Sequence, residues 1–165
     1  MRFFIISLNY KKNKQNSKRK KNNQNFILKQ LYTMNVFQCK PTETSPLVHL
    51  NPDNGELTIE GNAIPEDAEA FFHPILEWLD EYVNNTTVET TLNLKLHYFN
   101  VSSSKRILFI FYKLNELVKK NRSVLVKWHY VEGEDEMFEV GQDFAFMVNI
   151  PFHFIEYNPY VSATA

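Results

Sequence analysis

Three consecutive serines, Ser102, Ser103 and Ser104, are the side chains best placed for chemistry in this chain of 165 residues. They follow a segment of strand-like alternation that ends at Phe99, and a segment with helical spacing begins after them. A hydroxyl at a helix start can cap the helix by accepting a hydrogen bond from a first-turn N–H. It can also carry a phosphate, which the helix dipole favours. A nucleophilic role would need an activating base, and the sequence identifies none.

Histidines on predicted strands form a second candidate site. Three histidines could align across adjacent strands and form a metal or base cluster: His97, His129 and His153. The chain would then be a domain that binds a metal or small ligand on the sheet face of His97 and His129. The alternative is three separate, solvated side chains, because no carboxylate is spaced to orient a cluster. The acidic run from Glu132 to Glu136 could bind a cation, but such a run is more often a solvated loop and helix start. No cofactor is expected, since the chain has no Gly-rich loop.

The elements that position these residues follow from hydrophobic periodicity. Alternation places Leu92, Leu94, Leu96 and Tyr98 on one face of a strand. Pro74 should kink an early helix or mark its true start, and Pro151 suggests a bulge or an edge strand. Strands are expected at 47–50, 57–60, 91–99, 124–130 and 148–155, and helices at 65–85, 105–120 and 136–146. This order predicts an α/β fold, a mixed sheet of about five strands with helices mainly on one face.

Charge divides the chain at residue 33. Residues 1–33 carry nine Lys or Arg and no acid, whereas the remainder carries nine bases and all 19 acids. The first segment is either a basic disordered arm that contacts nucleic acid or lipid headgroups, or a mis-called start with translation beginning at Met34. The acidic body is a poor nucleic-acid binder and suits protein partners. The other segments are a lead-in at 34–45, a regulatory domain at 46–157 and a loose tail at 158–165.

The compartment is expected to be the cytoplasm. The apolar run from Phe3 to Leu8 is too short for a signal peptide, and no cleavage site follows it. The lone Cys39 excludes a disulfide framework and fits a reducing compartment. No stretch of 18 apolar residues is present, so no membrane span is expected.

One segment of the body, from Leu96 to Lys105, reads LHYFNVSSSK. This segment, together with 57–61, 65–68, 72–79, 126–130, 135–141 and 151–152, resembles the SiaC family of bacterial regulatory phosphoproteins. The resemblance covers about residues 46–155 and is strongest from Leu96 to Lys105.

This resemblance implies a fold like that of anti-anti-sigma factors (STAS-like) and no catalysis by this chain. It implies a partner-switching adaptor that a protein kinase phosphorylates and a PP2C-type phosphatase restores. The unphosphorylated form would bind and activate a diguanylate cyclase, which links the protein to cyclic-di-GMP signalling and biofilm formation.

One residue departs from the family pattern. The position of the family's phosphorylated threonine is Val101, which has no hydroxyl. Either Ser102 accepts the phosphate instead, or this member is locked in its binding-competent form. The phosphorylation candidates are Ser102 and Ser103. The partner-binding surface is expected to comprise Asn100, Val101, Ser102, Ser103, Ser104 and Lys105.

Overall fold

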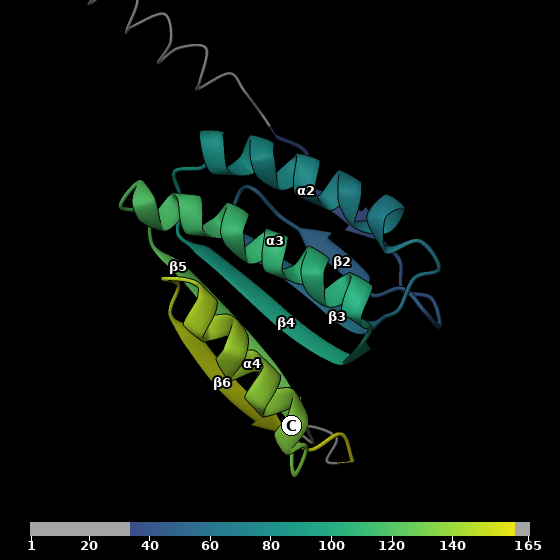
Figure 1. Ribbon diagram of the computed structural model, residues 1–165. Coiled ribbons are helices and arrows are strands. Elements are labelled where there is room, and N and C mark those ends of the chain that lie inside the picture. Colours follow the sequence, from purple (N-terminus) through teal and green to yellow (C-terminus); the bar gives the residue numbers. More distant parts are fainter. Residues whose placement is uncertain (1–33, 161–165) are drawn as a thin grey trace, which may run out of the picture. The chain divides into compact units, whose positions relative to one another are not determined.

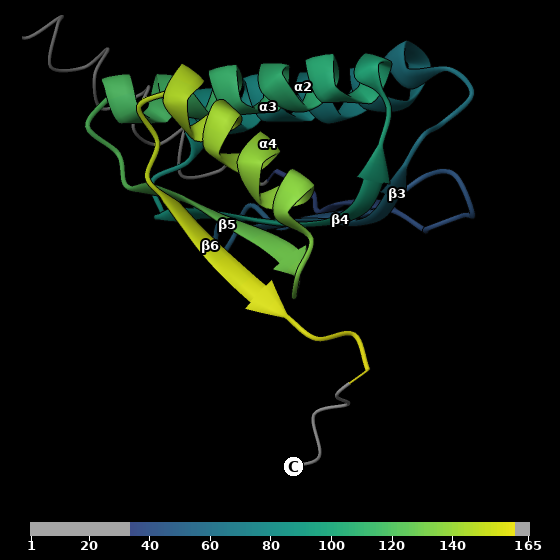
Figure 2. The same cartoon turned by 60° about the horizontal axis from the view of Figure 1, so that its bottom comes forward.

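A mixed sheet covered by helices on one face makes up residues 34–160, the part of the chain that this computed structural model describes (Figures 1 and 2). The predictions for residues 1–33 and for the last residues of the tail lie outside the described part. The elements are β1 (Phe37–Cys39), β2 (Leu47–Leu50), β3 (Glu56–Ala63), α2 (Ala68–Asn85), β4 (Thr90–Phe99), α3 (Val101–Lys119), β5 (Val124–Val131), α4 (Asp135–Met147) and β6 (Phe152–Tyr157).

The six described strands lie side by side in chain order, from β1 to β6. β1, β2 and β3 are antiparallel, whereas β3 to β6 are parallel and are joined by α2, α3 and α4. The predicted α/β fold is confirmed, and β1 is the strand that periodicity missed. It lies in the segment expected to be a lead-in, and its three residues are too few to show an alternation.

The end of β4 departs from the predicted alternation. Gly61 pairs with Leu96, but the next residue of β3, Asn62, pairs with Tyr98, so β4 contains one extra residue at this point. Such a bulge reverses which side chains face the core. Tyr98 is 59% exposed, and Phe99 instead packs edge-on against Trp128. The prediction that Tyr98 shares the core face of Leu96 was therefore wrong.

The core lies between the sheet and the helices. Its largest fully buried side chains include Trp128, Tyr82, Phe72 and Phe111. α2 begins after Asp67, whose carboxylate accepts a hydrogen bond from the Ala70 N–H at 2.9 Å. Pro74 lies inside α2 and does not mark its start. Pro151 directly precedes β6, which is an edge strand, as predicted.

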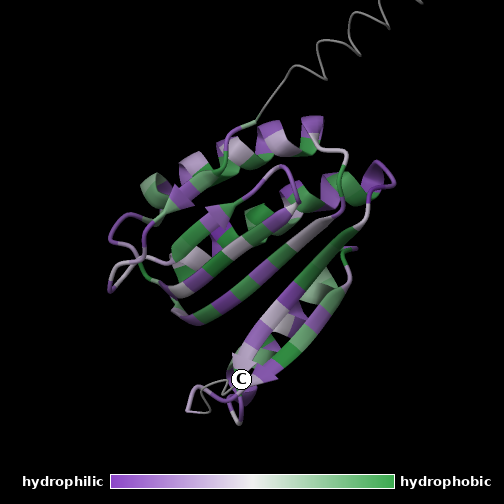
Figure 3. Cartoon of the chain, turned by 180° about the vertical axis from the view of Figure 1, so that it is seen from behind, coloured by the Kyte–Doolittle hydropathy of each residue, from purple (hydrophilic) through white to green (hydrophobic). Residues whose placement is uncertain are grey.

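No helix of the described part of the chain covers the opposite face of the sheet, and Figure 3 shows polar and apolar residues alternating along its strands. Lys95 of β4 contacts Glu60 of β3 at 3.1 Å on this face, and its ammonium lies 4.7 Å from the ring centre of Tyr157 in β6. Within residues 34–160, no helix combines the length and the apolar character that crossing a membrane requires.

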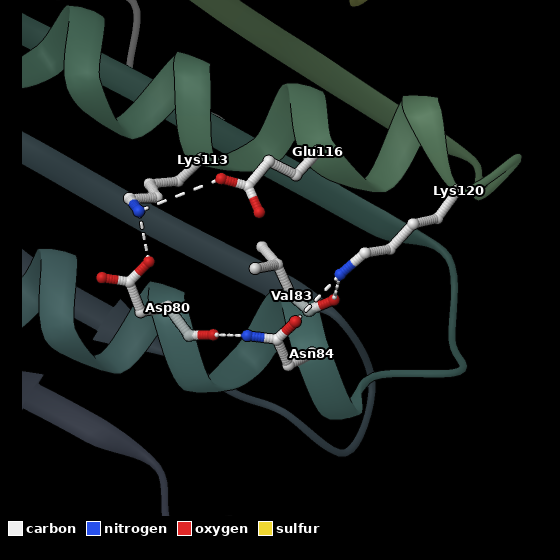
Figure 4. Close-up of polar contacts among 6 residues, drawn as sticks. All are labelled: Asp80, Val83, Asn84, Lys113, Glu116 and Lys120. Carbon is white, nitrogen blue, oxygen red and sulfur yellow. Dashed lines mark hydrogen bonds and ion pairs between the residues drawn. The ribbon is translucent and has the colours of Figure 1, made fainter.

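Hydrogen bonds and an ion pair of two lysines, in and directly after α3, connect this helix to the end of α2 (Figure 4). The Lys120 ammonium donates to the Val83 carbonyl at 2.9 Å and to the Asn84 side-chain oxygen at 3.0 Å, so it satisfies acceptors in the last turn of α2. One turn earlier in α2, Asp80 pairs with Lys113, which lies in α3 about two turns before Lys120. The hydrogen bond to Asp80 raises the pKa of Lys113, against the smaller opposing effect of burial.

Replacing Lys120 by methionine should therefore destabilise the fold. The variant Lys120→Met loses both hydrogen bonds to α2 and keeps the length of the side chain, so we expect the free energy of unfolding to fall by about 1 kcal/mol. Urea denaturation measures this change. The matched control is Lys119→Met, which alters the neighbouring exposed lysine and should stay within about 0.5 kcal/mol of the parent protein. Equal losses in the two variants would contradict a capping role for Lys120.

Candidate functional site

The start of α3 is held by Asn100, which the sequence analysis placed in the partner-binding surface. The Asn100 side-chain oxygen accepts a hydrogen bond from the Ser103 N–H at 2.8 Å, so asparagine caps this helix and no serine hydroxyl does. The Ser104 hydroxyl donates to the Val101 carbonyl at 2.8 Å within the same turn. The expectation of a serine cap was wrong because Asn100, two residues before the first serine, accepts the hydrogen bond that a serine cap would accept.

The Ser103 side chain is buried in the folded protein. Its exposure is 0%, and its hydroxyl has no hydrogen-bond partner among the described residues. A kinase needs a hydroxyl that it can reach, and phosphate at this depth would be a buried charge. The prediction of Ser103 as a phosphorylation candidate and as a contact residue is corrected, and Ser102, which is exposed, is the candidate that remains.

The first turn of α3 presents Val101 to solvent. Its side chain is 86% exposed. Ser102 and Lys105 are also exposed, one residue and one turn further on. We call these three residues the α3-start surface. The structure thus brings together on one turn the predicted partner-binding residues that remain accessible.

A cavity of about 480 Å³ lies beside this surface, between the starts of α2 and α3. Ser102 and Arg106 line it from α3, and Glu69 lines it from α2. The Arg106 guanidinium contacts the Glu69 carboxylate at 2.8 Å, so the two helices are joined across the cavity by an ion pair. The remaining lining residues are Pro65, Glu66, Asp67, Ala68, Asn100 and Lys105.

Arg106 and the segment that starts α2 were missed as part of the site. Helical periodicity identified the core residues of α3, but it does not tell which exposed residues of two helices meet. The starts of α2 and α3 lie together because both helices follow parallel neighbouring strands, β3 and β4, whose carboxyl ends meet at one edge of the sheet. A comparison of predicted strand ends was the signal that could have found this pairing.

The three histidines do not form a cluster. His153 pairs with Lys127, and Lys127 pairs with Asn93, whereas His97 lies farther along β4. His129 pairs with Ile155, so each histidine lies in a different row of the sheet. Among residues 34–160, no group of His, Cys, Asp and Glu side chains could hold a metal ion. The histidines therefore follow the alternative of three separate side chains, because His153 pairs with Lys127 and His129 pairs with Ile155.

Burial lowers the pKa of His129 below its usual value, and the nearby Lys95 and Lys127 lower it further against the opposing effect of Glu60. The folded protein therefore binds a proton at His129 less readily than the unfolded chain does. This contribution to stability is complete above pH 6.5, the usual pKa of histidine, and is lost as the pH falls below that value.

The variant His129→Gln should lose less stability on acidification than the parent protein. Glutamine cannot be protonated, so the decrease in the free energy of unfolding between pH 7.5 and pH 5.5 should be smaller in the variant. Chemical denaturation at both pH values measures the difference. The control is His153→Gln, which alters an exposed histidine two strand positions away. An identical decrease in parent and His129→Gln would contradict the proton linkage.

Comparisons with known proteins agree on the fold. Crystal structures of SiaC from Pseudomonas aeruginosa superpose on it. The apo form gives a TM-score of 0.69 at 24% identity, covering 74% of this chain and 99% of the other. A chain from the crystal structure of the diguanylate cyclase SiaD in complex with its activator SiaC gives a TM-score of 0.70 at 24% identity, covering 73% of this chain and 99% of the other.

Sequence comparison gives the family. An uncharacterized protein of Pseudomonas aeruginosa (strain UCBPP-PA14) is 26% identical over 111 residues, which cover 67% of this chain and 88% of that protein. The family model described as SiaC family regulatory phosphoprotein matches residues 39–157. The match includes the end of β1 and reaches the end of β6, so it spans the whole sheet. The chain therefore belongs to the SiaC family of regulatory phosphoproteins.

Proposed function

We propose that this protein is a non-catalytic signalling adaptor of the cytoplasm that binds a diguanylate cyclase through the α3-start surface. The observation that carries the proposal is the 86% exposure of Val101 at the first position of α3. An apolar side chain held outward on a rigid helix contributes nothing to the core and can be buried by a partner. The partner class is supported by the similar protein of Pseudomonas aeruginosa, which is described as the activator of a diguanylate cyclase.

A phosphate on Ser102 would control this docking. The Ser102 side chain lines the same cavity as Lys105 and Arg106, so the phosphate oxygens would lie within reach of two cations. We infer that Arg106 then exchanges its partner, leaving Glu69 for the phosphate. The added charge of about −2 would stand beside Glu66, Asp67 and Glu69 on a surface that a partner must desolvate.

The enzymes of this switch are a protein kinase that phosphorylates Ser102 and a PP2C-type phosphatase that removes the phosphate. This part of the proposal rests on the family's description as regulatory phosphoproteins and on the accessibility of Ser102. The alternative within the same family is a member that stays permanently competent to bind, because Val101 offers no hydroxyl. Phosphosite mapping of the protein purified from its native host distinguishes the two, since only the switch predicts phosphate on Ser102.

The docking surface is tested with the variant Val101→Asp and the diguanylate cyclase encoded in the same genome. A charge at the centre of an apolar contact should weaken binding about a hundredfold and remove stimulation of cyclic-di-GMP synthesis. The matched control is Gln142→Asp, which places the same charge on the exposed face of α4. Binding is measured by isothermal titration calorimetry. Equal affinity of Val101→Asp and the parent protein would reject the α3-start surface as the contact.

A further inference from the structure

β6 forms one edge of the sheet, and its outer side has no partner among residues 34–160. On its inner side, the Val126 N–H donates to the Pro151 carbonyl at 3.0 Å and the Glu132 N–H donates to the Tyr157 carbonyl at 2.9 Å. The N–H and C=O of one strand residue point to the same side, and successive residues alternate. The odd-numbered residues of β6 therefore face β5.

The backbone groups of Phe152, Phe154 and Glu156 consequently point away from β5, toward the free edge. Each of these residues offers one N–H donor and one C=O acceptor to a further strand. The row is continuous, because β6 pairs with β5 from Phe152 to Tyr157 without a shift in register. The edge is thus a complete template for one further strand.

β6 lacks several of the features by which proteins usually protect such an edge, although it carries one acid, Glu156, and Pro151 directly precedes it. Edge strands are commonly very short, or they carry lysine, proline or a bulge. β1, at the opposite edge, is three residues long. β6 is six residues long and reads FHFIEY, with neither lysine nor proline, and its aromatic and β-branched residues favour extended structure. A strand of this kind pairs readily with another strand.

We propose that the β6 edge pairs with the β6 edge of a second copy of this chain, in antiparallel orientation, so that two sheets join into one. An edge that is symmetric in its hydrogen-bonding groups is complementary to itself under a two-fold axis. When the axis passes through Phe154, Phe154 lies opposite the partner's Phe154, and Phe152 lies opposite the partner's Glu156. This register pairs every outward group of Phe152, Phe154 and Glu156, whereas a shift in either direction leaves some unpaired.

The positions of the β6 side chains are compatible with the same register. Phe152 packs against Phe111 of α3, and Phe154 packs against Phe138 of α4, so both lie on the helix-covered face. Opposed residues of an antiparallel pair share one face, which this register satisfies and which keeps the helices of both copies on the same side. Glu156 is the one acid of β6 and stands opposite an aromatic ring, so no like charges are opposed.

The experiment measures self-association of the full chain by sedimentation over a range of concentrations. The test variant is Glu156→Pro, because this N–H points away from β5 and its removal breaks no bond inside the sheet. Proline should weaken the dimer by about tenfold or more, since it removes a donor and places its ring in the path of the second strand. The matched control is Glu156→Ala, which keeps the N–H and should self-associate like the parent protein.

Amide hydrogen exchange supplies a readout at each residue. Protection of the Phe154 and Glu156 amides should rise with protein concentration, whereas the Ile155 amide, which faces β5, should be protected at every concentration. A chain that remains monomeric with freely exchanging Phe154 and Glu156 amides would overturn the proposal. So would a dimer that Glu156→Pro does not weaken, or protection that appears only when an extended peptide of another protein is added.

Discussion

Replacing Gly141 by alanine is expected to lower the free energy of unfolding by about 2 kcal/mol and the melting temperature by about 8 °C. A Cβ at this position would lie 2.7 Å from the Trp128 ring nitrogen and 2.8 Å from Cε1 of Phe154. Trp128 cannot move away freely, because it is 1% exposed and its ring N–H donates to the Met137 carbonyl at 3.0 Å. α4 must therefore shift away from the sheet.

The predicted loss of stability is opposite in sign to the usual effect of replacing glycine by alanine in a helix. Gly→Ala at an unhindered helix position stabilises a protein by up to about 1 kcal/mol, so close packing has to reverse the usual result. The neighbouring variant Gln142→Ala, on the exposed side of α4, should remain within about 0.5 kcal/mol of the parent protein. Thermal and urea unfolding measure both variants. A stabilised Gly141→Ala protein would contradict the contact between α4, Trp128 and β6.

Phosphoserine at position 102 is expected to weaken binding to the diguanylate cyclase by about a hundredfold or more. The phosphate adds charge to the first turn of α3, where Val101 and Ser102 are to be covered by the partner, and the neighbouring Glu66 and Glu69 are already acidic. Phosphoserine incorporated during translation gives a uniform sample. Binding of the phosphorylated and unphosphorylated proteins is compared by titration calorimetry.

The matched control carries phosphoserine at position 123, an exposed residue beyond the opposite end of α3. This sample has the same charge and should bind like the unphosphorylated protein. Equal weakening by the two modifications would mean that net charge, and not the α3-start surface, governs the interaction. Unchanged binding by the protein phosphorylated at Ser102 would remove the switch and leave a member that is always competent to bind.

The sequence predicted the layers of this fold better than the ends of its elements. Buried faces recur with the period of a helix or strand, so α2, α3, β4 and β5 are visible in the pattern of apolar residues. The sequence did not show that Phe99, and not Tyr98, faces the core. This follows from the bulge, which depends on how β4 pairs with β3 and not on the residues of β4 alone. β1 was missed for a related reason, since only its pairing with β2 makes it a strand.

The sequence indicated the segment around the start of α3 as the candidate site, but not which role each of its residues has. The chemistry of serine predicted a cap or a phosphate acceptor, and the two roles could not be divided among the three hydroxyls from sequence. The structure distinguishes the side chains. Ser103 faces the core and Ser102 faces solvent, whereas Asn100 caps the helix. The ion pair between Arg106 and Glu69 joins elements more than thirty residues apart, which no local pattern indicates.

Amide hydrogen exchange of this protein with and without the diguanylate cyclase tests most directly whether the start of α3 is the docking site. We predict slower exchange in residues 98–106 when the cyclase is bound, with the open sheet face of β3 and β4 unchanged. Slower exchange on that open face, with residues 98–106 unaffected, would contradict the account.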